Sequence, residues 1–143
     1  MRRIHNLRDV VDAISQNYAY VIIDNEAGLE HLSRRTTRDV QHLLVVSDPS
    51  QRGMVAAKRI GGFPHEMNIN IENTHLIVNR LPGGIMPEPL QTFIDQEIDF
   101  PLLGVIPQDD LVTEYEFSGK PIVEMDGESA VYQAVAEMMP KIV

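Results

Sequence analysis

The run Val21-Ile22-Ile23-Asp24-Asn25-Glu26-Ala27-Gly28 decides the fold class. Apolar β-branched residues lead to an aspartate and then to a glycine, a pattern that favours a buried strand followed by a turn. In an open α/β sheet, ligands bind at the carboxyl ends of the strands. A carboxylate at that edge needs a cation or hydrogen-bond donors, and a hydrated Mg²⁺ held together with substrate phosphates is one such partner. The alternative is that Asp24 only caps the turn or helix that follows.

An apolar run that ends in a polar residue or a proline recurs along the chain. We expect four strands, at residues 18–23, 42–48, 75–80 and 100–107. Nearly continuous apolar runs favour strands that are buried on both faces, as in parallel sheets. The other segments show helical spacing or turn composition. We expect helices at 5–17, 48–60, 89–98, 108–117 and 128–139, a loop with a short helix at 29–37, and a turn at 118–121.

The alternation of strands and helices predicts an α/β fold. We expect a single domain over residues 1–143, built on a mostly parallel sheet of about four strands with helices on both faces. Asp48 is the expected N-cap of the second helix, with Pro49 at the first helical position. The pair Gly61-Gly62 is expected to stop that helix.

Composition and charge exclude several classes of protein. The formal charge of −9 leaves no basic face for a nucleic-acid backbone. Because the 143 residues contain no cysteine, they hold neither a disulfide nor a thiolate metal site. No apolar run approaches the roughly 20 residues that span a bilayer, and the first residues lack the apolar core of a signal peptide. We therefore expect a cytoplasmic protein that does not bind nucleic acid and has no membrane span.

Four signatures, at residues 21–31, 46–50, 76–80 and 103–109, together resemble the MinD/ParA-like branch of the P-loop ATPases. The Asp-x-Glu-Ala-Gly-x-Glu-His string at residues 24–31 resembles most closely the accessory ATPases that help to insert nickel into carbon monoxide dehydrogenase. The resemblance covers nearly all of the chain but only the carboxyl-terminal half or so of such a protein. It implies a partial P-loop NTPase fold, ATP and Mg²⁺ as cofactors, and a homodimer or a partner ATPase subunit. It also implies a metalloenzyme client such as carbon monoxide dehydrogenase.

The resemblance assigns roles to residues of the first signature. Asp24 matches the Walker B-type acid that holds Mg²⁺ through water, and Ala27 and Gly28 match the switch that senses the γ-phosphate. Three further residues of this segment are metal-ligand candidates by residue type, against the alternative of a solvated polar loop. They are Glu26, Glu30 and His31. The remaining histidines, His5, His42, His65 and His75, show no ligand spacing in the sequence.

The later signatures match an adenine pocket. Asn79 matches the asparagine that reads adenine, and an amide suits this task because it donates and accepts hydrogen bonds at once. Arg80 follows it, and Pro107 and Asp109 match a loop that lines the same pocket. The alternative for Asn79 is a turn residue at the end of a strand.

The Walker A motif Gly-x-x-x-x-Gly-Lys-Ser/Thr does not occur in the 143 residues. Gly119-Lys120 is followed by Pro121, which has no N–H to donate to a phosphate. Without an amide cradle and a lysine, most of the positioning and charge stabilisation of phosphoryl transfer is missing, so we expect no ATPase activity from this chain alone. We favour the interpretation that the chain is a fragment of a longer ATPase. The alternative is a natural protein that lacks the amino-terminal half.

Two other functions are alternatives to a fragment of an ATPase. One is a non-catalytic interaction module that self-associates or binds an ATPase partner. The other, a phospho-receiver-like domain, is disfavoured because Ile106-Pro107 ends the last strand where a lysine would be expected.

The missing Walker A strand has a structural consequence. In the family that the chain resembles, this strand lies between the Walker B strand and the strand that matches Leu43–Ser47. Because unpaired central edges are costly, we expect the gap to close by pairing of Tyr20–Ile23 with Leu43–Val46, or to be filled by another copy of the chain.

Overall fold

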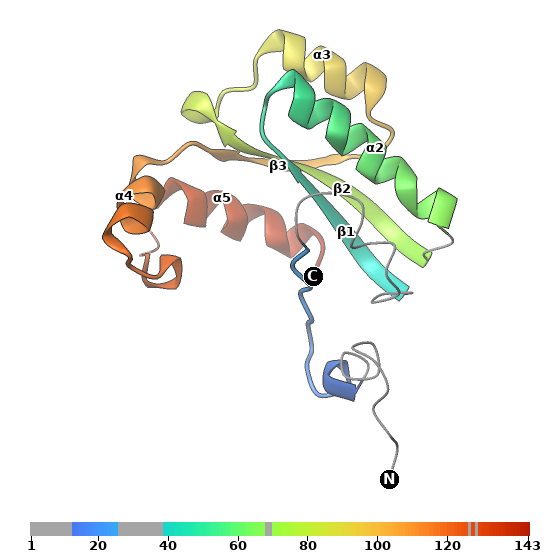
Figure 1. Cartoon of the computed structure of the whole chain (residues 1–143), viewed down its shortest axis with the longest axis horizontal. Coiled ribbons are helices and arrows are strands. Elements are labelled where there is room, and N and C mark those ends of the chain that lie inside the picture. The colour runs from blue at the N-terminus through green and yellow to red at the C-terminus, as the bar shows by residue number, and fades with distance from the viewer. Residues whose placement is uncertain (1–12, 26–38, 68–69, 126, 128) are drawn as a thin grey trace.

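A three-stranded parallel sheet forms the centre of the molecule (Figure 1). The computed structural model describes residues 13–25, 39–67, 70–125, 127 and 129–143. The strands lie in the order β1-β2-β3 and are joined by helices that cross over the sheet. The elements are β1 (Asp39–Ser47), α2 (Gln51–Met67), β2 (Asn70–Leu81), α3 (Glu88–Glu97), β3 (Leu102–Pro107), α4 (Asp110–Ser118) and α5 (Ala130–Met138), with 3-10 turns at Pro82–Gly84, Ile122–Glu124 and Met139–Lys141. The predicted α/β fold with a parallel sheet is confirmed.

Helices cover both faces of the sheet, as predicted. In Figure 1, α2 and α3 lie over one face and α5 lies under the other. Successive side chains of β2 point to opposite faces of the sheet, because side chains alternate along a strand, and each face carries its own hydrophobic core. Leu76 and Val78 are fully buried in the core beneath α2 and α3, whereas Ile77 is buried against α5. This burial on both faces explains why β2 reads as a continuous apolar run.

Helix α2 starts later and runs further than predicted. Ser50 caps it, because the Ser50 hydroxyl oxygen accepts a hydrogen bond from the N–H of Gly53 at 3.0 Å. Asp48 instead accepts from the N–H of Ser50 at 2.8 Å, so its prediction as the N-cap is wrong by two residues.

The predicted helix stop at Gly61-Gly62 is also wrong, since α2 continues through both glycines to Met67. A Cβ at Gly61 would lie 2.8 Å from Cδ1 of Phe100 and closer still to Cε1 and Cζ. Gly61 therefore lets the helix pack against this ring, and tertiary contact explains a glycine that resembles a terminator in the sequence.

The first predicted strand does not form. Residues 18–23 have no strand structure, and their apolar side chains are exposed, with 91% of Ile22 accessible to solvent. Among the described residues, β1 pairs only with β2, so the expected pairing of Tyr20–Ile23 with Leu43–Val46 is wrong for the single chain. Three of the four expected strands are present, and β1 lies at an edge of the sheet. Filling of this edge by another copy stays a prediction.

The other elements follow the sequence closely. The helices expected at 89–98, 108–117 and 128–139 correspond to α3, α4 and α5. Gly119 ends α4 with a left-handed φ of 67°, as a turn at 118–121 requires. Of the helix expected at 5–17, only residues from 13 onward are described, and residues 13–15 are helical. The loop expected at 29–37 lies outside the described residues. No helix among those described is long and apolar enough to cross a membrane.

Candidate functional site

The carboxyl ends of the strands meet at one edge of the sheet (Figure 1), and the predicted site residues Asn79 and Arg80 lie near the end of β2. Ser47, at the end of β1, lies opposite Val78 of β2, and Leu81, at the end of β2, lies opposite Pro107 of β3. Asn79 and Arg80 therefore stand next to the loop that starts at Pro107. The structure thus brings together the residues that the resemblance assigns to an adenine pocket. This edge is also where ligands bind in open α/β sheets.

Asn79 and Arg80 lie within β2 near its end, at an irregularity between Val78 and Leu81, which both pair with β3. The half-buried Asn79 accepts a hydrogen bond at its Oδ1 from the N–H of Arg80, at 2.9 Å. Arg80 has a φ of 57°, a left-handed conformation that costs an L-residue about 1–2 kcal/mol. The bond fixes the Asn79 side chain, and its Nδ2 donates to no group among the described residues. Asn79 therefore presents an oriented amide donor at the edge of the sheet.

The loop after β3 is tied directly to the end of β2. The N–H of Gln108 donates to the carbonyl of Leu81 at 2.9 Å, extending the β2–β3 pairing past Pro107. The turn Pro82–Gly84 lies over the same loop, since a Cβ at Gly84 would be 3.5 Å from Cβ of Pro107. Pro107 thus lies opposite Leu81, two residues after Asn79, on a backbone that its pairing with β2 holds in place.

Asp109 links the first turns of two helices. Its Oδ1 accepts from the N–H of Leu111 at 2.9 Å, which caps α4, and its Oδ2 accepts from the hydroxyl of Ser129 at 3.0 Å. The buried Ser129 in turn accepts from the N–H of Tyr132 and caps α5. The N–H of Leu111 is the first cause that lowers the pKa of Asp109, and the Ser129 hydroxyl also lowers it. Each carboxylate oxygen accepts one hydrogen bond, so Asp109 joins the first turns of α4 and α5 just after the end of β3.

Sequence reasoning missed Asp48 at this edge, whose carboxylate is influenced by the positive charge of the predicted site residue Arg80. Hydrogen bonds from Ser50 lower the pKa of Asp48, and the positive charge of Arg80 adds a smaller effect in the same direction. The close packing of α2 on the end of β1 requires a glycine, since a Cβ at Gly53 would lie 2.5 Å from Oδ1 of Asp48 and 2.7 Å from Oγ of Ser47. The signal in the sequence is the string Ser47-Asp48-Pro49-Ser50, which forms part of a family signature and a predicted helix start but carries no predicted site role.

Asp24 is not part of this assembly. Residues 21–25 have an irregular conformation with exposed side chains, and Asn25 Nδ2 bonds back to the carbonyl of Ile23 at 3.3 Å. Within the described residues, no hydrogen bond or ion pair joins Asp24 to the carboxyl ends of β1–β3. The other predicted residues of this segment lie outside the described residues. They are Glu26, Ala27, Gly28, Glu30 and His31.

Known proteins share both the sequence and the fold. No protein-family profile matches the chain. An uncharacterized ATP-binding protein of Methanocaldococcus jannaschii is 35% identical over 140 residues, covering 96% of this chain and 53% of that protein. The septum site-determining protein MinD of Bacillus subtilis is 32% identical over 119 residues, which are 81% of this chain and 44% of MinD. The carbon monoxide dehydrogenase accessory protein CooC of Rhodospirillum rubrum is 32% identical over 99 residues, covering 69% of this chain and 36% of CooC.

The solved structure of MinD from Pyrococcus horikoshii, a complex with Mg-ADP, matches 95% of this chain and 55% of MinD, with a TM-score of 0.71 and 25% identity. The chain belongs to the MinD/ParA-like family of P-loop ATPases. This MinD/ParA-like chain spans about half the length of the curated relatives it matches. The resemblance of the four sequence signatures to this family is therefore confirmed.

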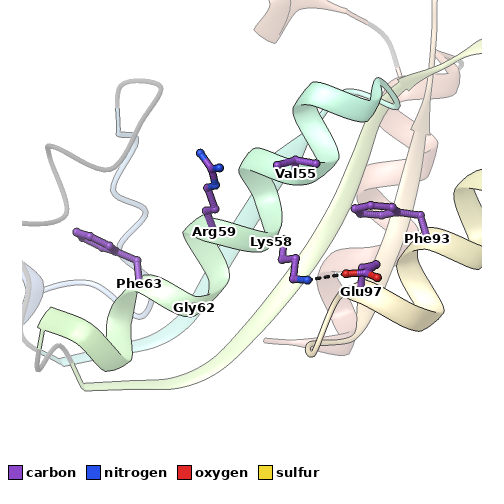
Figure 2. Close-up of a pocket in the computed structure, with 7 residues that line it drawn as sticks. All are labelled: Val55, Lys58, Arg59, Gly62, Phe63, Phe93 and Glu97. Atoms are coloured by element: carbon purple, nitrogen blue, oxygen red, sulfur yellow. Dashed lines mark hydrogen bonds and ion pairs between the residues drawn. The ribbon is translucent and has the colours of Figure 1, made fainter.

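A groove of the MinD/ParA-like chain lies between α2 and α3, away from the strand ends. Figure 2 shows that Lys58 of α2 reaches across it to Glu97 of α3, and the two form an ion pair of 2.6 Å. Glu97 raises the pKa of Lys58, but both side chains are about half exposed, so the pair adds little stability. The groove has a volume of about 620 Å³ and is lined by Val55, Lys58, Arg59, Gly62, Phe63, Phe93 and Glu97. Its lining offers no convergent acids or nucleophiles for chemistry.

Proposed function

We propose that the chain supplies the adenine-recognising edge of a MinD/ParA-like nucleotide site and has no ATPase activity by itself. The observation that carries this proposal is the pairing of Leu81 with Pro107, extended by the bond from Gln108 N–H to the Leu81 carbonyl, which places Asn79 two residues from the start of the β3 loop. The relatives support the ligand class, because one is named an ATP-binding protein and another was solved with Mg-ADP.

The residues at this edge fit a purine base that carries an amino group. Adenine offers ring nitrogens as acceptors and its N6 amino group as a donor. Asn79 Nδ2 supplies a donor, and Oδ1 keeps a second lone pair beyond the one that Arg80 N–H uses. Pro107 offers an apolar surface for the face of the ring. A guanine presents the opposite pattern at the same positions and is the mismatched ligand for a test.

The described residues do not fit the phosphates. They contain no Gly-x-x-x-x-Gly-Lys-Ser/Thr loop, and Asp24 makes no contact with the strand ends. In the complete site, Asp24 would hold Mg²⁺ through water, and Ala27 and Gly28 would sense the γ-phosphate. We further propose, from the likeness to CooC and the Asp24–His31 string, that the complete assembly acts in metallocentre maturation. Its client would be a nickel enzyme such as carbon monoxide dehydrogenase.

The proposal is tested by NMR titration of the ¹⁵N-labelled chain with adenosine, ATP and guanosine. Because only the base is held, adenosine and ATP should bind equally within about threefold, with Kd near ~1 mM, while guanosine binds more weakly. Shifts should concentrate at residues 79–81 and 107–109. Asn79→Ala should weaken adenosine binding about tenfold, which corresponds to the ~1.4 kcal/mol of the lost hydrogen bonds.

The matched control is Asn73→Ala, at the opposite end of β2, which should bind adenosine like the wild type. If adenosine leaves residues 79–81 and 107–109 unshifted, or if Asn79→Ala binds as tightly as Asn73→Ala, the strand ends do not read adenine.

A second candidate function, an interaction module, is favoured by the unpaired edge of β1. Among the described residues this edge has no strand beside it, Val46 of β1 is 54% exposed, and the apolar side chains of Tyr18–Ile23 are also exposed. Exposed strand edges pair readily with extended segments of other chains. A second copy, or an ATPase partner subunit, would cover them.

Analytical ultracentrifugation tests self-association through this edge. The wild type should form a dimer that Val46→Lys disrupts, because a lysine on a strand edge opposes pairing. Val123→Lys, at a residue that is 92% exposed outside the sheet, should leave the dimer intact. A monomer at all concentrations, or equal effects of the two variants, would exclude self-association through β1.

A further inference from the structure

His42 and His75 face each other across β1 and β2. Their ring planes are 26° apart, with centroids separated by 5.3 Å, and Nδ1 of His42 lies 3.1 Å from Nε2 of His75. The register explains the contact: His75 lies opposite Leu44, two residues after His42 on β1, so the two histidines are diagonal neighbours on the same face of the sheet. The two histidines show no ligand spacing in the sequence, but the parallel pairing of β1 with β2 brings their rings into contact.

We propose that His42 and His75 form a binding site for a divalent first-row transition metal ion, held by Nδ1 of His42 and Nε2 of His75. Imidazole nitrogen suits Zn²⁺, Cu²⁺ and Ni²⁺, whereas Mg²⁺ prefers oxygen. The site is separate from the strand ends that bear Asn79 and does not depend on the function proposed for them.

The distance between the two nitrogens fits a shared metal ion. Two imidazole nitrogens bound at 2.0–2.1 Å and separated by 3.1 Å subtend an angle of about 98° at the ion. This angle lies between the right angle of octahedral or square-planar coordination and the tetrahedral angle. The pair is therefore close to the separation it would have on the metal, and binding requires a rotation of the rings that turns both lone pairs toward the ion.

The protonation of the pair is also compatible with binding. Burial is the first cause that lowers the pKa of His75, and the neighbouring His42 lowers it further. In the metal-free pair, one ring donates its N–H to the other. In the metal-bound pair, that ring carries its proton on its other nitrogen, so both facing nitrogens offer lone pairs and no net proton is released.

Both histidines are half-buried on the α5 side of the sheet, where Ile77 and Leu103 form the neighbouring core. The part of the chain that the structure describes holds no cluster of three or more histidine or acidic ligands. The remaining coordination positions of the ion are therefore assigned to water. Such an open two-histidine site binds more weakly than a closed structural site and exchanges its metal readily.

The test is a Zn²⁺ titration of the full chain at pH 7.5, followed by calorimetry and by the ¹⁵N resonances of the histidine rings. One Zn²⁺ should bind per chain, and the largest shifts should be at Nδ1 of His42 and Nε2 of His75. His42→Gln and His75→Gln should each weaken binding at least about tenfold, and the double variant should bind no more weakly than either single one. Cu²⁺ should bind more tightly than Zn²⁺, following the general order for nitrogen ligands.

His65→Gln is the matched control and should bind Zn²⁺ like the wild type. The ring resonances of the wild-type chain keep the test valid if a variant fails to fold. The proposal is overturned if Zn²⁺ shifts only the rings of other histidines, if it does not bind, or if folded His42→Gln and His75→Gln bind it as the wild type does.

Discussion

The two adjacent glycines of α2 should respond to the same substitution with opposite signs. An alanine at Gly61 places a Cβ 2.8 Å from Cδ1 of Phe100 and closer to two other ring atoms, whereas a Cβ at Gly62 meets no heavy atom within 4 Å. Overpacking lowers the free energy of unfolding by about 1–3 kcal/mol, whereas replacing glycine by alanine inside a helix raises it by about 0.5–1 kcal/mol. We expect Gly61→Ala to lower the free energy of unfolding by roughly 1–2 kcal/mol and Gly62→Ala to raise it by about 0.5–1 kcal/mol.

Urea unfolding followed by far-ultraviolet circular dichroism measures both changes, since the chain has no tryptophan to serve as a fluorescent probe. Phe100→Ala removes the ring and provides the decisive background. In that background, Gly61→Ala should become stabilising and resemble Gly62→Ala, so that the coupling between Gly61 and Phe100 is about 1–3 kcal/mol. The reasoning is refuted if the two alanine variants have equal stability with Phe100 present, or if Gly61→Ala still destabilises after the ring is removed.

Two further predictions concern titratable residues. Burial, and secondarily His42, lower the pKa of His75 below its ordinary value of about 6.5, so the unfolded chain binds more protons as the pH falls below that value. The free energy of unfolding should therefore decrease on acidification from about pH 7.5 to 5.5, and a urea series at each pH should show a smaller decrease for His75→Gln. Asp109→Ala removes the cap of α4 and the partner of Ser129, and should cost about 1–2 kcal/mol at pH 7, whereas Asp110→Ala should change stability by less than about 0.5 kcal/mol. Because the pKa of Asp109 is lowered in the folded chain, its stabilising effect should be complete above pH 3.8 and be lost as the pH falls through the folded-state pKa. Equal unfolding curves for Asp109→Ala and Asp110→Ala would contradict the assigned cap.

Strands β2 and β3 were predictable because their signals are local. Each is an apolar run that ends in a polar residue or a proline, and each lies beside a strand that completes its hydrogen bonds. Tyr18–Ile23 carries the same signal and is not a strand, because β propensity reports the fit to neighbouring strands, and no described strand lies beside it. Gly61 fails as a predicted terminator for a similar reason, since Phe100, 39 residues later, determines its role.

The position of the candidate site could be predicted from the sequence, but the hydrogen-bond partners of its residues could not. Placing Asn79 near the start of the β3 loop required only that two strands end at the same edge of a parallel sheet. The role of Asp109 could not be inferred, because the hydroxyl that occupies its Oδ2 comes from Ser129, at the start of a later helix. The contact between His42 and His75 depends on the register of β1 against β2, which the sequence does not specify.

The base-binding part and the Mg²⁺-binding part of the proposed nucleotide site depend on different strands. The base-reading edge at Asn79 is complete within β2 and β3, because every strand that holds it is present and paired. Asp24 follows a segment that would become a strand only with a hydrogen-bonded neighbour, and the edge of β1 has the same requirement. A strand placed between them would satisfy both edges at once, bury Val46, and bring Asp24 to the carboxyl edge of the sheet. Base binding should therefore not require a partner chain, whereas any role of Asp24 with Mg²⁺ should appear only with one.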